Sequence, residues 1–188
     1  MTKETVTLRP VPFVWETLKR LTPQGGTVVD VGCGPSLYRS AVSGRYIGVD
    51  ITDAPYRDGV PRDVDVVAPA DAMPLADETV DLIFTLSAFY QMGDSRKVLA
   101  EFRRVLRPGG RLLIVDYNRR TRRRLAPKEN LAYPAWSQWR LVREVRGASF
   151  HQVHLLTATE HETRGFERLR RLVLEELRGQ WAIVTGVR

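Results

Sequence analysis

The sequence predicts an α/β fold built on a mostly parallel sheet, and three observations support this class. Residues 27–31 form an apolar run without polar alternation, which is typical of a strand covered on both faces. The run leads into Gly32 and Gly34, which allow a sharp turn and a close approach of the backbone to a ligand. Further short apolar runs and amphipathic helical patterns follow along the chain: 46–51, 80–86, 95–106 and 111–115.

The first part of the chain alternates helical and strand patterns. Apolar residues recur at helical spacing over 11–21, which predicts a helix that either covers a ligand cleft or only packs on the sheet. After the strand at 27–31 and its glycine turn, residues 35–42 fit the helix that should follow. A second strand is expected at 46–51, and a strand-like run surrounds 64–68.

The second part continues the same alternation. Residues 80–86 read as an apolar strand, and the apolar positions of 95–106 fall on one face of a helix. Pro108, Gly109 and Gly110 indicate a turn before a fifth strand at 111–115. A last strand is expected at 181–186. With 188 residues, the chain has the size of one domain with a single core, so we expect one domain over 1–188.

The acidic residues around the glycine turn narrow the choice of ligand. Asp30 precedes the turn, where a carboxylate suits an amine or a sulfonium better than a pyrophosphate. The dinucleotide fingerprint requires a small residue where Leu37 stands. Asp50, eighteen residues after Gly32, suits a ribose diol, which a nicotinamide cofactor also carries. Asp71 suits the amine of an adenine, against which Met73 can pack.

Four segments together resemble the class I S-adenosylmethionine-dependent methyltransferases in order and spacing. They are 30–34, 46–50, 71–83 and 104–112. The resemblance covers about residues 11–118 and is strongest to the small-molecule branch that includes the quinone and menaquinone C-methyltransferases. It implies a Rossmann-like, seven-stranded, mostly parallel sheet with the last strand antiparallel and helices on both faces. It also implies a strand after Phe166, where the periodicity of 166–177 favours a helix; both assignments stay open.

The resemblance further implies which residues hold S-adenosylmethionine. The methionine end would lie near Asp30 and the glycine turn, the ribose near Asp50, the adenine near Asp71, and the methionine amine near the end of the fourth strand. The full predicted set is Asp30, Gly32, Cys33, Gly34, Asp50, Ile51, Asp71, Ala72, Met73, Leu86 and Ser87. Ser36 departs from the family pattern, which often has a third glycine there. Cys33, the single cysteine, is read as a small residue rather than a nucleophile.

The basic charge is concentrated in one segment. The chain carries a net charge of +7, and residues 117–150 hold nine basic residues against two acidic ones, which equals the whole excess. The resemblance places the segment 117–157 beside the methyl acceptor. The predicted substrate-side residues are Tyr117, Arg122, Arg123, Arg124, Trp136 and Trp139 of this segment, together with Tyr90 in the loop after the fourth strand. Arginine and aromatic side chains together suit an anionic or aromatic acceptor. A solvated basic face explains the charge equally well.

Methyl transfer from a sulfonium is a direct displacement, so a general base is required only when the acceptor atom carries a proton. Five residues are candidates for that base: Tyr90, Asp116, Tyr117, His151 and His154. The histidines have ordinary pKa values near neutrality, although a structural role is the simpler explanation for each. No fixed base follows from the resemblance.

Several functions remain in competition at this point. The first is a methyltransferase acting on a small molecule; the second uses the basic segment to bind RNA; the third is a cofactor-binding subunit without catalysis. Leu86 and Ser87 stand where nucleic-acid amino-methyltransferases have an Asn-Pro-Pro-Tyr signature, which disfavours base methylation. A nicotinamide dehydrogenase is disfavoured. We expect a cytoplasmic protein without a signal peptide, membrane span or metal site, and no pattern indicates its oligomeric state.

Overall fold

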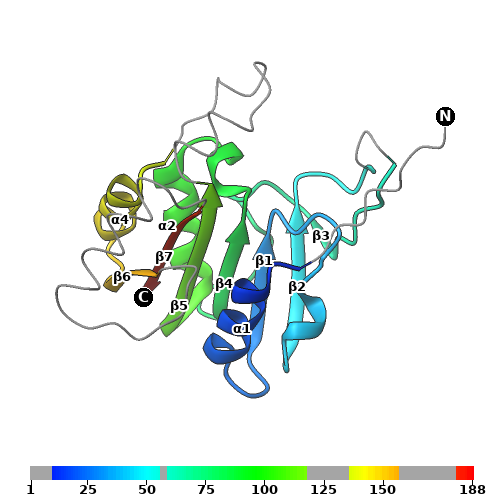
Figure 1. Ribbon diagram of the computed structural model, residues 1–188, viewed down its shortest axis with the longest axis horizontal. Helices are drawn as coiled ribbons and strands as arrows, with labels where there is room; N and C mark the ends of the chain where they lie inside the picture. Colours follow the sequence, from blue (N-terminus) through cyan, green and yellow to red (C-terminus); the bar gives the residue numbers. More distant parts are fainter. Residues whose placement is uncertain (1–9, 56–58, 118–135, 157–180) are drawn as a thin grey trace.

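A computed structural model describes residues 10–55, 59–117, 136–156 and 181–188. In this part of the chain seven strands form one sheet in the order β3-β2-β1-β4-β5-β7-β6 (Figure 1). The strands are β1 (Thr27–Val31), β2 (Arg45–Asp50), β3 (Val66–Val67), β4 (Val80–Leu86), β5 (Leu106–Tyr117), β6 (His151–Leu156) and β7 (Trp181–Val187). Strands β1 to β5 pair in parallel, whereas β7 runs antiparallel to both β5 and β6. The predicted fold class is confirmed.

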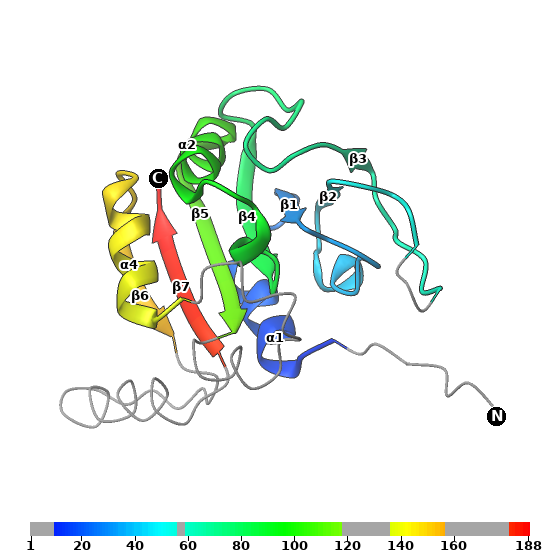
Figure 2. The same cartoon turned by 90° about the horizontal axis from the view of Figure 1, so that it is seen from above.

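Helices cover both faces of the sheet. Figure 2 shows α2 (Ser95–Val105) and α4 (Gln138–Gly147) on one face and α1 (Pro12–Leu21) on the other. Each face has its own buried cluster: Val98, Phe102, Leu141 and Val145 belong to the first, and Val14 and Leu18 belong to the second. Side chains of alternate strand residues supply both clusters, because successive strand residues point to opposite faces. This explains why the central strands lack polar alternation.

Local sequence sets the helix ends. α1 begins with Pro12 in its first turn, where the missing N–H is not needed. The Asp94 side chain caps α2 by accepting a hydrogen bond from the Arg96 N–H at 2.9 Å. The Ser137 hydroxyl accepts the corresponding bond from the Arg140 N–H at 3.2 Å and caps α4. α1 packs in the second cluster and contributes no residue to the ligand pocket described below, which favours packing as its role.

The helix predicted at 35–42 is not present. Only one 3₁₀ turn, Arg39–Ala41, forms there. Gly34 and Ser36 both have positive φ angles, of 52° and 50°, which no helix can contain. The Ser36 hydroxyl donates a short hydrogen bond to the Asp63 carbonyl, so the serine that replaces the expected third glycine fixes the chain that crosses over the loop.

The predicted turn at Pro108, Gly109 and Gly110 lies inside a strand. β5 begins at Leu106, and the register against β4 shifts between Val80 and Leu82 to accommodate the irregular start. Gly109 takes a φ of 78°, and its N–H donates to the Arg188 carbonyl at 3.2 Å. Pairing with the end of the chain therefore extends the strand beyond the apolar run that predicted it.

The sixth strand comes from a run that the sequence left unassigned. β6 contains the two candidate histidines and pairs with β7 at the outer edge of the sheet. Residues 166–177, whose assignment stayed open, lie outside the described residues. None of the helices in the described ranges is long and apolar enough to cross a membrane.

Candidate functional site

A cavity of about 620 Å³ lies at the carboxyl ends of four neighbouring strands, β3, β2, β1 and β4. Its wall consists of Val31, Gly32, Asp50, Ile51, Arg62, Ala68, Pro69, Ala70, Asp71, Leu86, Ser87, Ala88, Gln91, Met92 and Gly93. In open α/β sheets ligands bind at this end of the strands, and the volume falls within the usual range of small-molecule sites. Six of the residues predicted to hold a cofactor are brought together here: Gly32, Asp50, Ile51, Asp71, Leu86 and Ser87.

The glycine turn makes close approach possible at one wall of the cavity. Gly32 has a φ of 75°, and its N–H donates to the Val49 carbonyl at 2.8 Å. A Cβ at this position would lie 2.4 Å from the Cβ of Ala88, which follows β4. No side chain fits there, so the first and fourth strands converge on the cavity only because residue 32 is glycine.

Asp50 is the most firmly held polar group in the cavity. Its Oδ2 accepts from the Gly34 N–H and from Nη1 of Arg62, both at 2.9 Å, and its Oδ1 accepts from the Ile51 N–H at 2.8 Å. A carboxylate offers about four acceptor positions. The arrangement therefore leaves one position on Oδ1 for a ligand hydroxyl and a second on Oδ2 if Arg62 moves.

An ion pair on α2 holds the loop that carries Asp71. Glu101 and Arg104 of α2 form a bidentate pair, with both N–O distances at 2.7 Å. Glu101 also accepts from the Met73 N–H at 2.7 Å, and Arg104 donates to the Met73 carbonyl at 3.0 Å. The Arg104 hydrogen bond keeps the pKa of Glu101 below its usual value. These contacts fix residues 73–75 and leave the Asp71 side chain exposed at the rim.

Asp30 does not line the cavity. Its side chain is 3% exposed and accepts a hydrogen bond from the Tyr46 hydroxyl at 2.5 Å. The pKa of Asp30 is raised to about 7, chiefly because the carboxyl is buried; the hydrogen bond from Tyr46 opposes the rise, the charge of Asp50 adds to it, and the charge of Arg39 opposes it. At neutral pH this carboxyl is thus only partly ionised. Because it lies outside the cavity wall, its predicted interaction with the cationic end of a cofactor would be a longer-range electrostatic attraction without direct contact.

Four more predicted cofactor residues lie near the cavity but outside its wall. Gly34 contributes its N–H to Asp50, and Ala72 is exposed next to Asp71. Met73 is 3% exposed within the hydrophobic core. Cys33 is 7% exposed, and burial together with Asp30 raises the pKa of its thiol to about 12. Cys33 therefore stays a protonated thiol, as expected of a small packing residue.

Three of the predicted acceptor-side residues, Tyr90, Tyr117 and Trp136, lie around Asp116 and the turn Phe89–Gln91. Tyr90 and Tyr117 are half-buried. The Asp116 carboxylate accepts a hydrogen bond from the backbone N–H of each, at 2.9 and 3.1 Å. Trp136 is 2% exposed and packs on Phe89 with ring centroids 5.5 Å apart, so its ring belongs to the core. Trp139 is 49% exposed on α4. Arg122, Arg123 and Arg124 lie outside the described residues.

The candidate bases differ in their distance from the cavity. Asp116 is fully buried at the end of β5, next to the 3₁₀ turn Phe89–Gln91 that contributes to the cavity wall. His151 and His154 are exposed on β6, at the opposite edge of the sheet from β3. The structure does not bring the histidines together with the cavity residues.

Arg62 is the main site residue that sequence reasoning missed. It reaches the wall from the segment between β2 and β3, and its Nε also donates to the Ala54 carbonyl at 2.9 Å. No periodicity marks it, since the segment is neither strand nor helix. Gln91, Met92 and Gly93 were missed because they follow the end of β4 at Leu86 by five to seven residues. A glycine with a φ of 80° at position 93 was the available signal.

Comparison with known proteins finds similarity to methyltransferases. Residues 29–114 match the family described as "Methyltransferase domain". An uncharacterized methyltransferase of Mycobacterium sp. (strain KMS) is 32% identical over 113 residues, which cover 57% of this chain and 44% of the relative. A malonyl-[acyl-carrier protein] O-methyltransferase of Methylococcus capsulatus is 31% identical over 115 residues, covering 55% of this chain and 42% of the relative. The matches thus span less than half the length of these relatives.

A solved structure extends the likeness over the whole fold. The complex between the Haloferax volcanii Trm112 methyltransferase activator and the putative methyltransferase contains a chain that superposes with a TM-score of 0.68 and 22% identity. The superposition covers 93% of this chain and 88% of that one. This chain is thus similar in sequence to methyltransferases over residues 29–114 and shares the fold of a methyltransferase of known structure, with the four motifs in register and the cavity at their meeting point.

Proposed function

We propose that this protein transfers a methyl group from S-adenosylmethionine to a small-molecule acceptor, with the whole chain as one catalytic domain and residues 117–157 on the acceptor side. The observation that carries the proposal is the cavity in which Asp50, Asp71 and the Gly32 turn converge at the ends of the strands. The relative from Methylococcus capsulatus, named for O-methylation of a carrier-bound malonyl group, supports an acceptor that carries negative charge.

The residues present fit the methyl donor. Asp50 is oriented by three donors and offers Oδ1 to a ribose hydroxyl. Asp71 is exposed at the rim, where an adenine amine can donate to it, and Ile51, 72% exposed beside it, offers an apolar surface for the ring. Ser87 has a φ of 53° and turns the chain away from β4, so that the backbone at the strand end can meet the methionine amine.

The main contribution of the protein to methyl transfer is to position the methyl donor and the acceptor. The sulfonium supplies an activated methyl group, and an acceptor atom displaces the sulfur in line. The chain's own residues contribute by holding donor and acceptor in register and excluding water, and proximity of this kind accounts for about 7 to 11 kcal/mol of barrier lowering. Asp116 is our candidate for accepting a proton from the acceptor, because it is bonded to the Tyr90 N–H, in the turn whose Gln91 contributes to the cavity wall.

Calorimetry with S-adenosylhomocysteine and with NAD tests the cofactor assignment. We expect S-adenosylhomocysteine to bind and NAD not to bind; binding of NAD alone would overturn the assignment. Asp71→Ala should weaken the binding of S-adenosylhomocysteine by about 10- to 150-fold, since a hydrogen bond to a charged group contributes about 1.5 to 3 kcal/mol. Asp53→Ala, an exposed acid outside the cavity wall, is the matched control.

RNA as the acceptor is the second candidate, favoured by the nine basic residues within 117–150. The two acceptors separate by salt dependence, because contacts to several phosphates make affinity fall steeply with salt whereas a small acceptor gives a shallow slope. A binding subunit without catalysis is the third. Methyl transfer from labelled S-adenosylmethionine to a panel of small carboxylic acids and phenols, against transfer to total RNA, distinguishes all three.

A further inference from the structure

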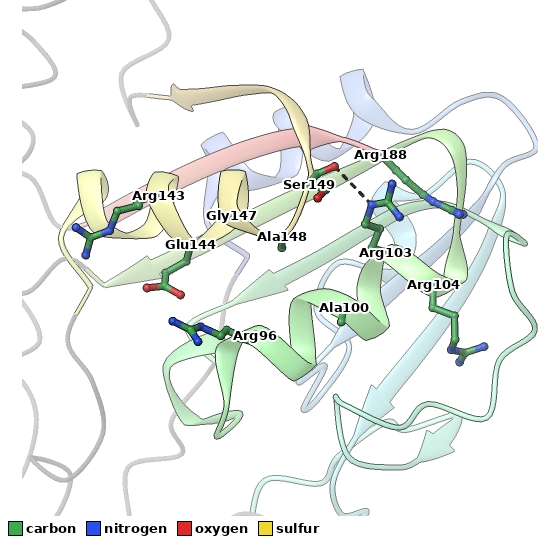
Figure 3. Close-up of a pocket in the computed structure, with 10 residues that line it drawn as sticks. All are labelled: Arg96, Ala100, Arg103, Arg104, Arg143, Glu144, Gly147, Ala148, Ser149 and Arg188. Carbon is green, nitrogen blue, oxygen red and sulfur yellow. Dashed lines mark hydrogen bonds between the residues drawn. The ribbon is translucent and has the colours of Figure 1, made fainter.

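A second hollow lies on the outer surface of the molecule, between α2 and α4. It encloses about 800 Å³ and shares no lining residue with the cavity described above. Figure 3 shows arginine side chains rising from both helices and from the end of β7 around it. Its lining consists of Arg96, Ala100, Arg103, Arg104, Arg143, Glu144, Gly147, Ala148, Ser149 and Arg188. We call this hollow the arginine groove.

Two of the five arginines are already neutralised. Arg104 pairs with Glu101 and Asp77, and Figure 3 shows it pointing out of the groove. Arg188 pairs with Glu78 at 2.6 Å. These two residues close one end of the groove and contribute little free charge.

The other three arginines have no carboxylate within ion-pair distance among the described residues. Arg96 and Arg143 are exposed on facing helices, and Arg103 is half-buried, with its Nε 3.5 Å from the Ser149 carbonyl. Glu144, the one acidic residue of the lining, accepts a hydrogen bond from the Ser95 hydroxyl at 3.4 Å. The like charges of arginines that line one hollow repel one another, and an anionic ligand relieves that repulsion.

The spacing of the free arginines matches a helix. Arg96 and Arg103 are seven residues apart on α2, which places them on one face and about 10.5 Å apart along the axis at 1.5 Å per residue. Ala100 lies between them, and Gly147 and Ala148 line the side of α4. A floor of small residues leaves room for another backbone to lie between the two helices.

An exposed aromatic residue continues this face. Trp139 is four residues before Arg143 on α4 and therefore lies on the same side of that helix. With 49% of its surface exposed, it is one of three exposed large apolar side chains in the described ranges. Tryptophan and arginine are the residues most enriched among the energetic centres of protein interfaces.

We propose that the arginine groove binds an acidic helical segment of a partner protein. Carboxylates seven residues apart on such a helix repeat at the spacing of Arg96 and Arg103, and an apolar side chain of the same helix covers Trp139. Glu144 favours this occupant over RNA, because a helix can place an uncharged residue opposite it, whereas a phosphate backbone is negative throughout. The inference goes beyond methyl transfer and does not depend on it.

Binding of labelled probes, measured by fluorescence anisotropy, tests the proposal. The probes are an alanine-based helical peptide with glutamates seven residues apart, the same peptide with the glutamates five residues apart, and a single-stranded RNA of equal charge. The groove variant combines Arg96→Gln, Arg103→Gln and Arg143→Gln. The control variant removes equal charge elsewhere, through Lys19→Gln, Arg45→Gln and Lys97→Gln.

We expect the groove variant to bind the first peptide about tenfold more weakly than the wild type, a loss of about 1.4 kcal/mol, and the control variant to stay within about twofold. A second variant, Ala100→Glu, keeps every arginine and adds a carboxylate to the exposed floor; it should block binding equally. Equal loss in the control, equal binding of the two peptides, no binding to the wild type, or tighter and steeply salt-dependent binding of the RNA would each overturn the proposal.

Discussion

Replacing Asp30 with asparagine should change how stability depends on pH. Asp30 is buried on β1, and its pKa rises from 3.8 to about 7 chiefly because burial disfavours its charged form. Between these values the folded state holds a proton that the unfolded state has released, so stability falls as pH rises. At about 1.36 kcal/mol per pKa unit, the decrease reaches about 4 kcal/mol by pH 8. Asparagine still accepts from Tyr46 but does not titrate.

Urea unfolding of both proteins between about pH 5 and 8.5 measures the effect, because other titrating groups cancel in the difference between them. We expect the free energy of unfolding of the wild type, relative to Asp30→Asn, to decrease with rising pH and to level off above the folded-state pKa. Asp53→Asn, at an exposed carboxylate, should show no such trend. A difference that is independent of pH, or that grows with pH, would refute the assignment of a buried, protonated Asp30.

Three further outcomes follow from the same geometry. Gly32→Ala forces a left-handed φ on alanine and a clash with Ala88, which should destabilise the fold by about 2 to 4 kcal/mol in urea unfolding and remove S-adenosylhomocysteine binding. Glu101→Gln breaks the bidentate pair with Arg104 and should lower stability by about 2 kcal/mol, with faster amide exchange in residues 73–75. Cys33 should resist iodoacetamide in the native protein and react in urea, because its thiol is buried and protonated; rapid native labelling would contradict this.

The central strands were predictable because a strand that is buried on both faces consists mainly of apolar residues. Residues 27–31 and 80–86 each lie between two other strands and under helices, so eight of their twelve positions are apolar. β6 escaped prediction for the opposite reason. It is an edge strand with exposed histidines at 151 and 154, and pairing with β7, close to the end of the chain, selects its conformation. Tertiary pairing of this kind has no local sequence signal.

The site divides in the same way. Asp50 and Asp71 could be predicted because Asp50 ends β2 and Asp71 follows β3 by four residues, and the ends of parallel strands meet at one edge of the sheet. Arg62 could not, because the irregular segment after β2 is positioned by tertiary bonds, such as that from the Asp63 N–H to the Gly34 carbonyl at 2.8 Å. Asp30 was placed correctly on its strand, but the direction of its side chain depends on the pleat and on Tyr46, which only the fold fixes.

The number of charged residues in a segment does not show which arginines lack an acidic partner; the ion pairs in the folded structure do. By count, the residues outside 117–150 are neutral. Many of their acids, however, are engaged with particular arginines: Arg39 with Asp63 and Asp65, Arg62 with Asp50, Arg104 with Glu101 and Asp77, Arg107 with Asp81, and Arg188 with Glu78. Arg39 and Arg104 each pair with two acids. Although acidic and basic residues are equal in number outside 117–150, Arg96 and Arg103 therefore have no acidic partner in the part of the chain that the structure describes. These two join Arg143, from inside the basic segment, to form a surface that neither segment predicts alone.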